Sequence, residues 1–260
     1  MEQEKLFHHI NKLFVKAFAT YRLLEDDDHI LVGLSGGKDS LCLLELLAKR
    51  ARIHHPRFRV EAIHVRMENV SYETSTDYLE RFCHALDVPL HVVTTRFDSS
   101  PFTLHSSQPK DSSPFTLHSS LKKKPACFLC SWNRRKQMFN LAQELGCNKI
   151  ALGHHQDDLL HTALLNLLYQ GRFDSMPAKL KMRKMPLTII RPLCMIPESD
   201  IRRYAELQRY EKQIKLCPYE DKTRRTDIRH LFEEAERMNP EARFSLWNAL
   251  VRSGKLVEEY

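Results

Sequence analysis

The spacing of apolar residues changes twice in the first fifty positions of the chain. Between positions 6 and 18 apolar side chains recur three and four residues apart, which predicts an amphipathic helix. A short apolar run at 29–35 then ends in glycines, and a leucine-rich stretch at 41–48 follows at once. This order indicates a strand, a glycine turn and a second helix.

The alternation of strand and helix continues along the chain. Helices are predicted near 76–86 and up to position 169, and further strands at 60–65, 90–94, 149–153 and 187–191. Strands that alternate with helices favour a parallel sheet covered on both faces. We therefore expect an α/β fold with a doubly wound parallel sheet of five strands, in which ligands bind at the carboxyl ends of the strands.

Three segments are expected along the 260 residues. They are an N-terminal helical segment at 1–26, the α/β domain at 27–195 and a helical C-terminal extension at 196–260. Within the domain the ten residues Asp-Ser-Ser-Pro-Phe-Thr-Leu-His-Ser-Ser occur twice, at 98–107 and 111–120. We predict that 98–124 is a duplicated mobile surface loop, with a functional binding element as the alternative.

Charge and cysteine content narrow the class of protein. The net charge of +7 and the pI of about 9.0 suit a polyanionic partner such as nucleic acid, although a solvated basic surface has the same composition. No apolar run approaches the ~18 residues that a membrane span needs, so a soluble cytoplasmic protein without membrane contact is expected. Seven cysteines, an odd number, argue against a disulfide framework.

The segment 35–40, SGGKDS, predicts a phosphate site. Its small residues leave backbone N–H groups unobstructed at a helix N-terminus, and Lys38 adds a positive charge. The spacing fits neither the Walker loop nor the dinucleotide-binding motif. A carboxylate such as that of Asp39 repels phosphate unless a cation such as Mg²⁺ lies between them. The alternative is an ordinary glycine turn, in which the aspartate only makes a favourable interaction with the helix dipole.

Cys127 and Cys130 are spaced so that two thiolates can reach one metal centre, and Cys217 could be a third ligand. Three thiolates suit a [4Fe–4S] cluster with one open iron. Zinc, completed by His154 or His155, is the weaker alternative, and inert thiols or a redox pair are another. The remaining cysteines are expected to be buried and structural: Cys42, Cys83, Cys147 and Cys194.

A second polar turn follows the strand predicted at 149–153. Gly153 would allow close approach of the backbone, and Asp157 and Asp158 open the next helix. The two aspartates could hold Mg²⁺ or position an activated base, or could only answer the helix dipole. Arg134 could stabilise charge on an intermediate, or could be a solvated helix residue.

Four segments carry a resemblance to a known family. SGGKDS at 35–40 is similar to the signature of the PP-loop, or N-type, ATP pyrophosphatases. PACFLCSWNRRK at 125–136, KIALGHHQDD at 149–158 and IRPL at 190–193 resemble the tRNA 2-thiocytidine synthetase family. The resemblance implies that ATP adenylates O2 of a cytidine in the tRNA anticodon loop, and that sulfide held at a [4Fe–4S] cluster then displaces AMP.

The resemblance also implies the site residues. Catalysis is expected from Asp39, Arg134, Asp157 and Asp158. Cluster binding is expected from Cys127, Cys130 and Cys217. ATP binding is expected from Gly33, Ser35, Gly36, Gly37, Lys38, Asp39, Ser40, Val65 and Gly153.

The implied cofactors are ATP, Mg²⁺ and the cluster, and the implied partners are tRNA, a sulfur donor such as a cysteine desulfurase, and a second copy in a homodimer. Two alternatives stay open at this point. One is another PP-loop enzyme, making 2-thiouridine or lysidine in tRNA. The other is a zinc-stabilised RNA-binding protein with a vestigial nucleotide fold.

Overall fold

The computed structural model describes most of the chain. Its described residues are 2–53, 55–68, 71–72, 75–96, 126–211, 215–216 and 224–258, with the backbone alone at 71–72, 126–127 and 215–216. The duplicated segment predicted as a mobile loop and the predicted cluster ligand Cys217 lie outside these residues. None of the helices in the described ranges could span a lipid bilayer.

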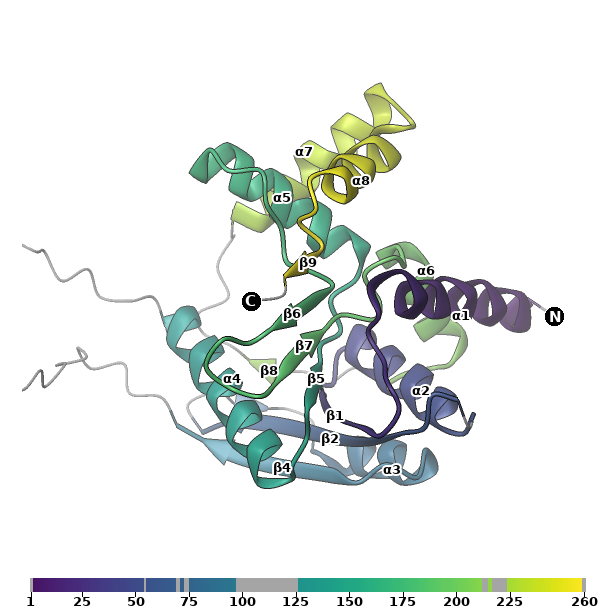
Figure 1. Cartoon of the computed structure of the whole chain (residues 1–260), viewed down its shortest axis with the longest axis vertical. Helices are drawn as coiled ribbons and strands as arrows, with labels where there is room; N and C mark the ends of the chain where they lie inside the picture. The colour runs from purple at the N-terminus through teal and green to yellow at the C-terminus, as the bar shows by residue number, and fades with distance from the viewer. Residues whose placement is uncertain are drawn as a thin grey trace, which may run out of the picture.

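A mostly parallel sheet forms the centre of the molecule (Figure 1). Its strand order is β4-β2-β1-β5-β7-β6-β9, and the first five strands pair in parallel. These five correspond to the predicted strands, so the α/β class and the parallel arrangement are confirmed. The strands are β1 (Asp28–Gly33), β2 (Phe58–Met67), β3 (Ser71–Tyr72), β4 (Leu90–Thr95), β5 (Lys149–Ala151), β6 (Lys179–Lys181), β7 (Thr188–Ile190), β8 (Lys215–Leu216) and β9 (Val257–Glu258).

The sheet has two strands more than the five expected. β6 runs antiparallel to β7, and β9 pairs with β6 at the edge. β3 and β8 form a separate antiparallel pair. These segments are two or three residues long, and β6 alternates lysine with leucine, so no apolar run reveals them. They form because their backbone N–H and C=O groups can pair with those of an adjacent strand.

The order of the strands reverses between β1 and β5. From β1 the chain moves outward to β2 and β4, and it then returns to β5 on the opposite side of β1. Ligands of open α/β sheets bind at such a switch point, outside the carboxyl ends of the strands. The segments that follow β1 and β5 therefore meet at the expected binding position.

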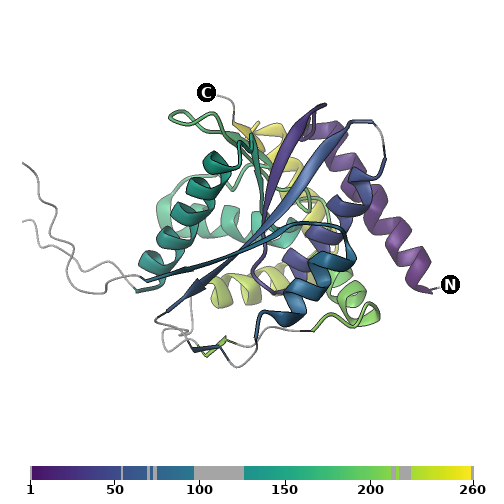
Figure 2. The same ribbon diagram turned by 90° about the horizontal axis from the view of Figure 1, so that it is seen from below.

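Helices cover both faces of the sheet (Figure 2). One face carries α4 over a small buried cluster that includes Leu31, Ile63 and Ile150. The other face carries the large cluster, which joins α1, α2, α5 and α6. The helices are α1 (Glu2–Tyr21), α2 (Lys38–Ala51), α3 (Asp77–Ala85), α4 (Ala126–Glu144), α5 (Gln156–Gln170), α6 (Glu198–Leu207), α7 (Arg224–Met238) and α8 (Ala242–Arg252).

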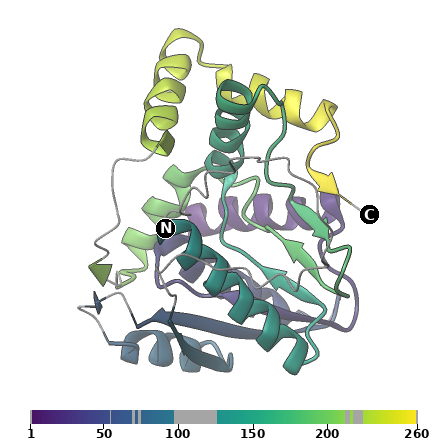
Figure 3. The same ribbon diagram turned by 90° about the vertical axis from the view of Figure 1, so that its left-hand side faces the viewer.

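Two helices hold the binding edge in place. Leu41, Leu44 and Leu47 of α2 are fully buried, and each such side chain stabilises the fold by about 1.5–3 kcal/mol. The burial of α2 fixes its N-terminus directly after β1. At the other end of the chain, α7 and α8 pack against α5 beyond the edge of the sheet (Figure 3). The C-terminal helices therefore lie close to the turn that begins α5.

Candidate active site

The loop between β1 and α2 is held by its two serines. The N–H group of Ser35 donates to Oγ of Ser40 at 3.1 Å, and the Ser40 hydroxyl donates to the carbonyl of Gly37 at 2.9 Å. Gly36 has a φ of +79°, in the region that glycine adopts without steric cost. The loop is thus pinned at the N-terminus of α2, where backbone N–H groups and the helix dipole favour an anion.

Lys38 lies between two carboxylates. Its Nζ is 3.1 Å from Oδ1 of Asp39 and 3.1 Å from Oε1 of Glu198, which begins α6. Burial opposes the charge of Lys38, but the two carboxylates outweigh burial and raise its pKa. Burial likewise acts against the charge of Glu198, yet Lys38 leaves the pKa of Glu198 below its ordinary value. Lys38 and Glu198 are therefore both charged at neutral pH.

Gly153 brings the turn after β5 onto the phosphate loop. A Cβ at this position would lie 3.1 Å from the backbone carbon of Asp39 and 3.1 Å from the backbone nitrogen of Ser40. Such contacts are tighter than nine in ten of those that real Cβ atoms make, and here the neighbour that would have to move is backbone. The described structure therefore gives Gly153 a packing reason, a close contact between two backbones, independent of any nucleotide.

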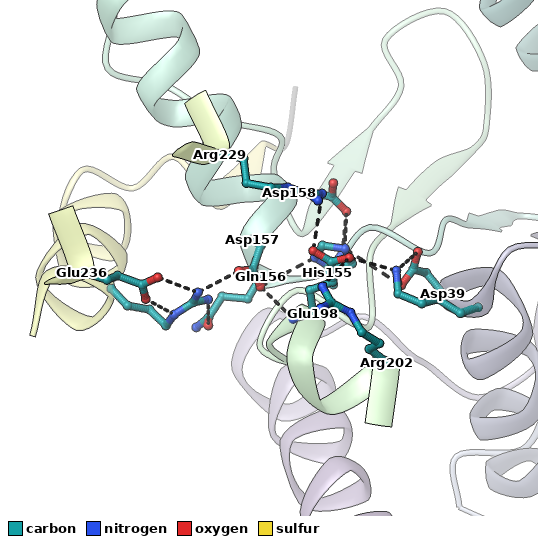
Figure 4. A network of polar contacts seen from close by, with 11 residues as sticks. Asp39, His155, Gln156, Asp157, Asp158, Glu198, Arg202, Arg229 and Glu236 are labelled. Carbon is teal, nitrogen blue, oxygen red and sulfur yellow. Dashed lines mark hydrogen bonds and ion pairs between the residues drawn. The ribbon is translucent and has the colours of Figure 1, made fainter. Parts of the chain in front are cut away.

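The two aspartates that open α5 have different surroundings (Figure 4). Both oxygens of Asp157 are engaged, because Oδ1 accepts from Arg243 at 2.7 Å and Oδ2 accepts from the N–H group of Glu198 at 2.8 Å. Its side chain is 9% exposed. Asp158 is 33% exposed, and its Oδ2 accepts from the N–H group of His155 at 3.0 Å. Only the carboxylate of Asp158 is open toward solvent.

His155 joins the turn to the phosphate loop. Its side chain is buried, and Nε2 lies 3.5 Å from Oδ2 of Asp158 and 3.9 Å from Oδ1 of Asp39. Asp39 and Asp158 therefore face the same imidazole from the first turns of two helices, α2 and α5, as Figure 4 shows.

Arg243 ties the C-terminal helices to this turn. It donates to Glu236 of α7 at 2.8 Å and to Gln156 at 3.2 Å, besides its bond to Asp157. Burial acts to raise the pKa of Asp157, but the hydrogen bonds from Arg243 and from the N–H group of Glu198, with the nearby positive charge, together outweigh burial and leave that pKa below its ordinary value. Sequence reasoning missed Arg243 and Glu198. Neither lies in a motif, and an acidic residue after Pro197 is typical of any helix N-terminus.

A cavity of about 170 Å³ opens beside the phosphate loop, between the ends of β1 and β2 and helix α4. Gly33, Ser35, Val65 and Arg134, four residues singled out from the sequence, line it together. The rest of the lining is mainly apolar. A side chain at Gly33 would meet Sδ of Met138 at 3.0 Å, so glycine keeps this wall open.

The structure describes part of the cysteine constellation. Cys130 lies on α4 as a half-buried free thiol, and Cys127 precedes it by one turn of the same helix. The side chain of Cys127 lies outside the described residues, as does Cys217. Among the described side chains, no group of three or more His, Cys, Asp and Glu could hold a metal ion.

The other four cysteines are buried, as expected. Burial raises the pKa of the Cys83 thiol to about 12, that of Cys147 to about 11 and that of Cys194 to about 12, and it raises the pKa of Cys42 as well. Thiols of this kind stay protonated and unreactive.

Comparison with known proteins gives consistent results. The family model described as "PP-loop domain" matches residues 3–235. A tRNA-cytidine(32) 2-sulfurtransferase of Bordetella avium (strain 197N) is 34% identical over 255 residues, which cover 96% of this chain and 75% of the relative. A protein of the same name from Paraburkholderia phymatum is 32% identical over 253 residues, covering 96% of this chain and 69% of the relative.

A solved structure has the same fold. The U34-tRNA thiolase NcsA from Methanococcus maripaludis with its [4Fe-4S] cluster superimposes with a TM-score of 0.72 at 22% identity, covering 98% of this chain and 81% of that chain.

Proposed function

Because the chain belongs to the PP-loop family, and within it to the tRNA-cytidine(32) 2-sulfurtransferases, we propose that it uses ATP to replace O2 of a tRNA cytidine with sulfur. One observation carries the proposal for these residues. The phosphate loop and the carboxylate-bearing turn touch at Gly153, at the switch point of the sheet. A triphosphate and the group it activates can therefore meet there.

The triphosphate would lie on the backbone N–H groups of the loop 35–40, beside Lys38. Adenine would enter the cavity lined by Gly33 and Val65, whose apolar walls suit a flat base. Arg134 lines the same cavity, where its guanidinium would stabilise negative charge on the α-phosphate.

Mg²⁺ would be held by Asp39 and Asp158. Oδ1 of Asp39 is buried and accepts no hydrogen bond from a described residue, although Lys38 lies near it as an ion-pair partner. Hard cations such as Mg²⁺ prefer carboxylate and phosphate oxygens. Asp157, whose oxygens are both engaged, would instead position the turn.

The proposed reaction has two steps. First, O2 of cytosine attacks the α-phosphorus of ATP, the bond from that phosphorus to the oxygen bridging the α- and β-phosphates breaks, and pyrophosphate leaves with the electron pair. Sulfide then attacks C2, and the C2–O2 bond breaks as AMP leaves with O2. Adenylation is needed because the ring oxygen alone is a poor leaving group, whereas AMP is a good one. A sulfur donor such as a cysteine desulfurase would supply the sulfide.

Cys127, Cys130 and Cys217 would hold a [4Fe–4S] cluster. The first two share one face of α4, since they are three residues apart on a helix, and the thiol of Cys130 is free. When bound by three thiolates, such a cluster supplies an iron with an open position for sulfide. A broad visible absorption of anaerobically purified protein would support the cluster, and its absence with bound zinc would contradict it.

The activity is tested by AMP release from ATP in the presence of tRNA. Asp39→Ala should abolish AMP release, whereas Asp77→Ala, at an exposed position of α3, should leave it unchanged. Retained AMP release in Asp39→Ala would refute the proposed site. Mass spectrometry of tRNA nucleosides from a deletion strain then identifies the product, since the proposal requires 2-thiocytidine to disappear and 2-thiouridine and lysidine to remain.

A further inference from the structure

A second cavity, of about 300 Å³, opens on the other side of the turn that begins α5. It lies between α5 and α7 and contacts the proposed ATP site through Asp158, which lines the cavity and also faces His155. Its polar lining includes His154, Thr162, Arg225 and Arg229, and its apolar lining includes Met176. Apart from Asp158, the residues that line the cavity have no part in ATP binding as proposed above.

The hydrogen-bonding character of His154 is fixed by Arg191. Nε of Arg191 lies 3.2 Å from Nδ1 of His154, and an arginine N–H group can only donate. Nδ1 must therefore be the acceptor, so in the neutral ring Nε2 carries the hydrogen. Burial together with Arg191 lowers the pKa of His154 to about 3, so the ring is neutral at physiological pH. Arg191 is held in turn by the carbonyl of Pro177 at 2.5 Å.

His154 thus offers a donor to the cavity and Asp158 offers an acceptor. In the described part of the chain, no residue accepts a hydrogen bond from Nε2 of His154 or donates one to Oδ1 of Asp158. Arg225 is exposed on α7 at the rim of the cavity, where it adds positive charge.

A donor beside an acceptor matches one edge of cytosine. The exocyclic amine at C4 donates to a carboxylate, and the adjacent ring nitrogen N3 accepts from an N–H group. Uracil in the same orientation would set O4 against the carboxylate and N3–H against the histidine N–H, which leaves both pairs repulsive. Proteins that read single-stranded RNA loops commonly hydrogen-bond such edges of unstacked bases.

We propose that this cavity receives the target cytosine, turned out of the RNA, with its amine on Asp158 and its N3 on Nε2–H of His154. The inference rests on the proposed function and names the residues that select the base. O2 is adjacent to N3, so it lies on the His154 side, next to the turn that contacts the phosphate loop. As O2 attacks phosphorus, positive charge develops on the ring and its amine, and the carboxylate of Asp158 stabilises it. Arg225 binds the RNA backbone.

Binding of anticodon stem–loop RNA without ATP tests the base selection. The two RNAs carry cytidine or uridine at position 32, and fluorescence anisotropy measures their affinity for the full chain. The wild-type protein should bind the cytidine RNA about tenfold more tightly, the discrimination expected of a paired base edge. His154→Phe should weaken the cytidine RNA and narrow the preference, while Asp158 still distinguishes the amine of cytosine from O4 of uracil. His154→Gln, whose amide can donate from a similar position, should recover part of the preference.

Three further variants sharpen the result. Asp158→Asn replaces the carboxylate with an amide, which can donate to O4 of uracil as well as accept from the cytosine amine, and should narrow the preference for cytidine. Arg225→Ala should weaken both RNAs equally and lower the salt dependence of binding. Asp77→Ala, at an exposed position of α3 outside the cavity lining, should bind as the wild type does.

Equal binding of both RNAs by the wild type, or an undiminished preference in both His154→Phe and Asp158→Asn, would overturn the inference. These outcomes are separate from failure of the proposed function. A protein that thiolates tRNA but does not discriminate the two RNAs in binding refutes only the base pocket, whereas one that releases no AMP with tRNA refutes the function.

Discussion

A charged cluster lies at each end of β1, and the two differ in how far they are buried. At the amino end, Lys149 lies 2.6 Å from Asp28, and their side chains are 5% and 1% exposed. Lys149 also donates to the carbonyl of Leu23, and Asn148 donates to the other oxygen of Asp28. At the carboxyl end, Lys38 and Asp39 are 29% and 28% exposed.

The amino-terminal cluster is closed, because its charges are paired among themselves and shielded from water. The carboxyl-terminal cluster is open, because more than a quarter of each of the Lys38 and Asp39 side chains is exposed and can still reach a ligand. A buried ion pair such as Lys149–Asp28 is therefore not by itself a sign of function. Damage to the closed cluster should reduce stability, and damage to the open cluster should reduce activity.

Lys149→Met should give the largest loss of stability. It leaves the carboxylate of Asp28 buried without a counter-charge, which costs about 3–5 kcal/mol. The melting temperature should fall by about 10 °C for a chain of this size. Thermal and urea unfolding measure the change. The double variant Asp28→Asn with Lys149→Met removes the stranded charge and should recover most of the stability; if it is no more stable than Lys149→Met, the pairing argument fails.

Lys38→Met should mainly reduce activity. Loss of one preorganised positive group beside the phosphates is expected to lower kcat by about 10²–10³-fold. AMP release with saturating tRNA measures the change, and the melting temperature should stay within a few degrees of the wild type. Lys16→Met, at an exposed lysine of α1, is the control. A large fall in melting temperature with unchanged kcat would reverse the assignment of the open cluster.

Gly153→Ala should reduce both the stability of the fold and the affinity for ATP, each by a moderate amount. Its Cβ would press on the backbone of α2, and overpacking of this kind costs about 1–3 kcal/mol. The shift of α2 should also weaken ATP binding, which calorimetry measures. Gly37→Ala is the contrast, because its Cβ would have ordinary contacts and its φ of −85° suits alanine. It should retain full stability, and an equal loss of stability in both variants would contradict the packing role of Gly153.

Arg243→Gln should give the smallest effect and link stability to pH. The hydrogen bond from Arg243 to Asp157 should contribute about 1–2 kcal/mol at neutral pH. Since Arg243 and the other hydrogen-bond donor together outweigh burial, the pKa of Asp157 is lowered; this contribution is therefore complete above the ordinary carboxyl pKa of about 4 and is lost as pH falls through the lowered value. Urea unfolding of both proteins at pH 7 and at pH 3 measures it. A stability difference that grows toward acid pH would contradict the assignment.

Local sequence patterns predicted most of the fold because each depends on neighbours in the chain. The apolar run before SGGKDS identified β1, and the leucines after it identified α2. Cys127 and Cys130 could likewise be recognised as a pair from their spacing, because both lie on the single helix α4. The edge strand β6 could not be found in this way, since three residues with alternating lysines carry too little signal. Its formation depends on the edge that β7 offers.

The family, the α/β class and the segments that carry the chemistry follow from motifs and periodicity, which are properties of consecutive residues. The separate roles of the residues in those segments follow from contacts made on folding. Folding engaged both oxygens of Asp157 with Arg243 and Glu198, left Asp158 open, and fixed the hydrogen on Nε2 of His154 through Arg191. Those properties depend on hydrogen-bonding residues that folding brings together. A residue far along the chain cannot be recognised as such a partner from the local sequence pattern.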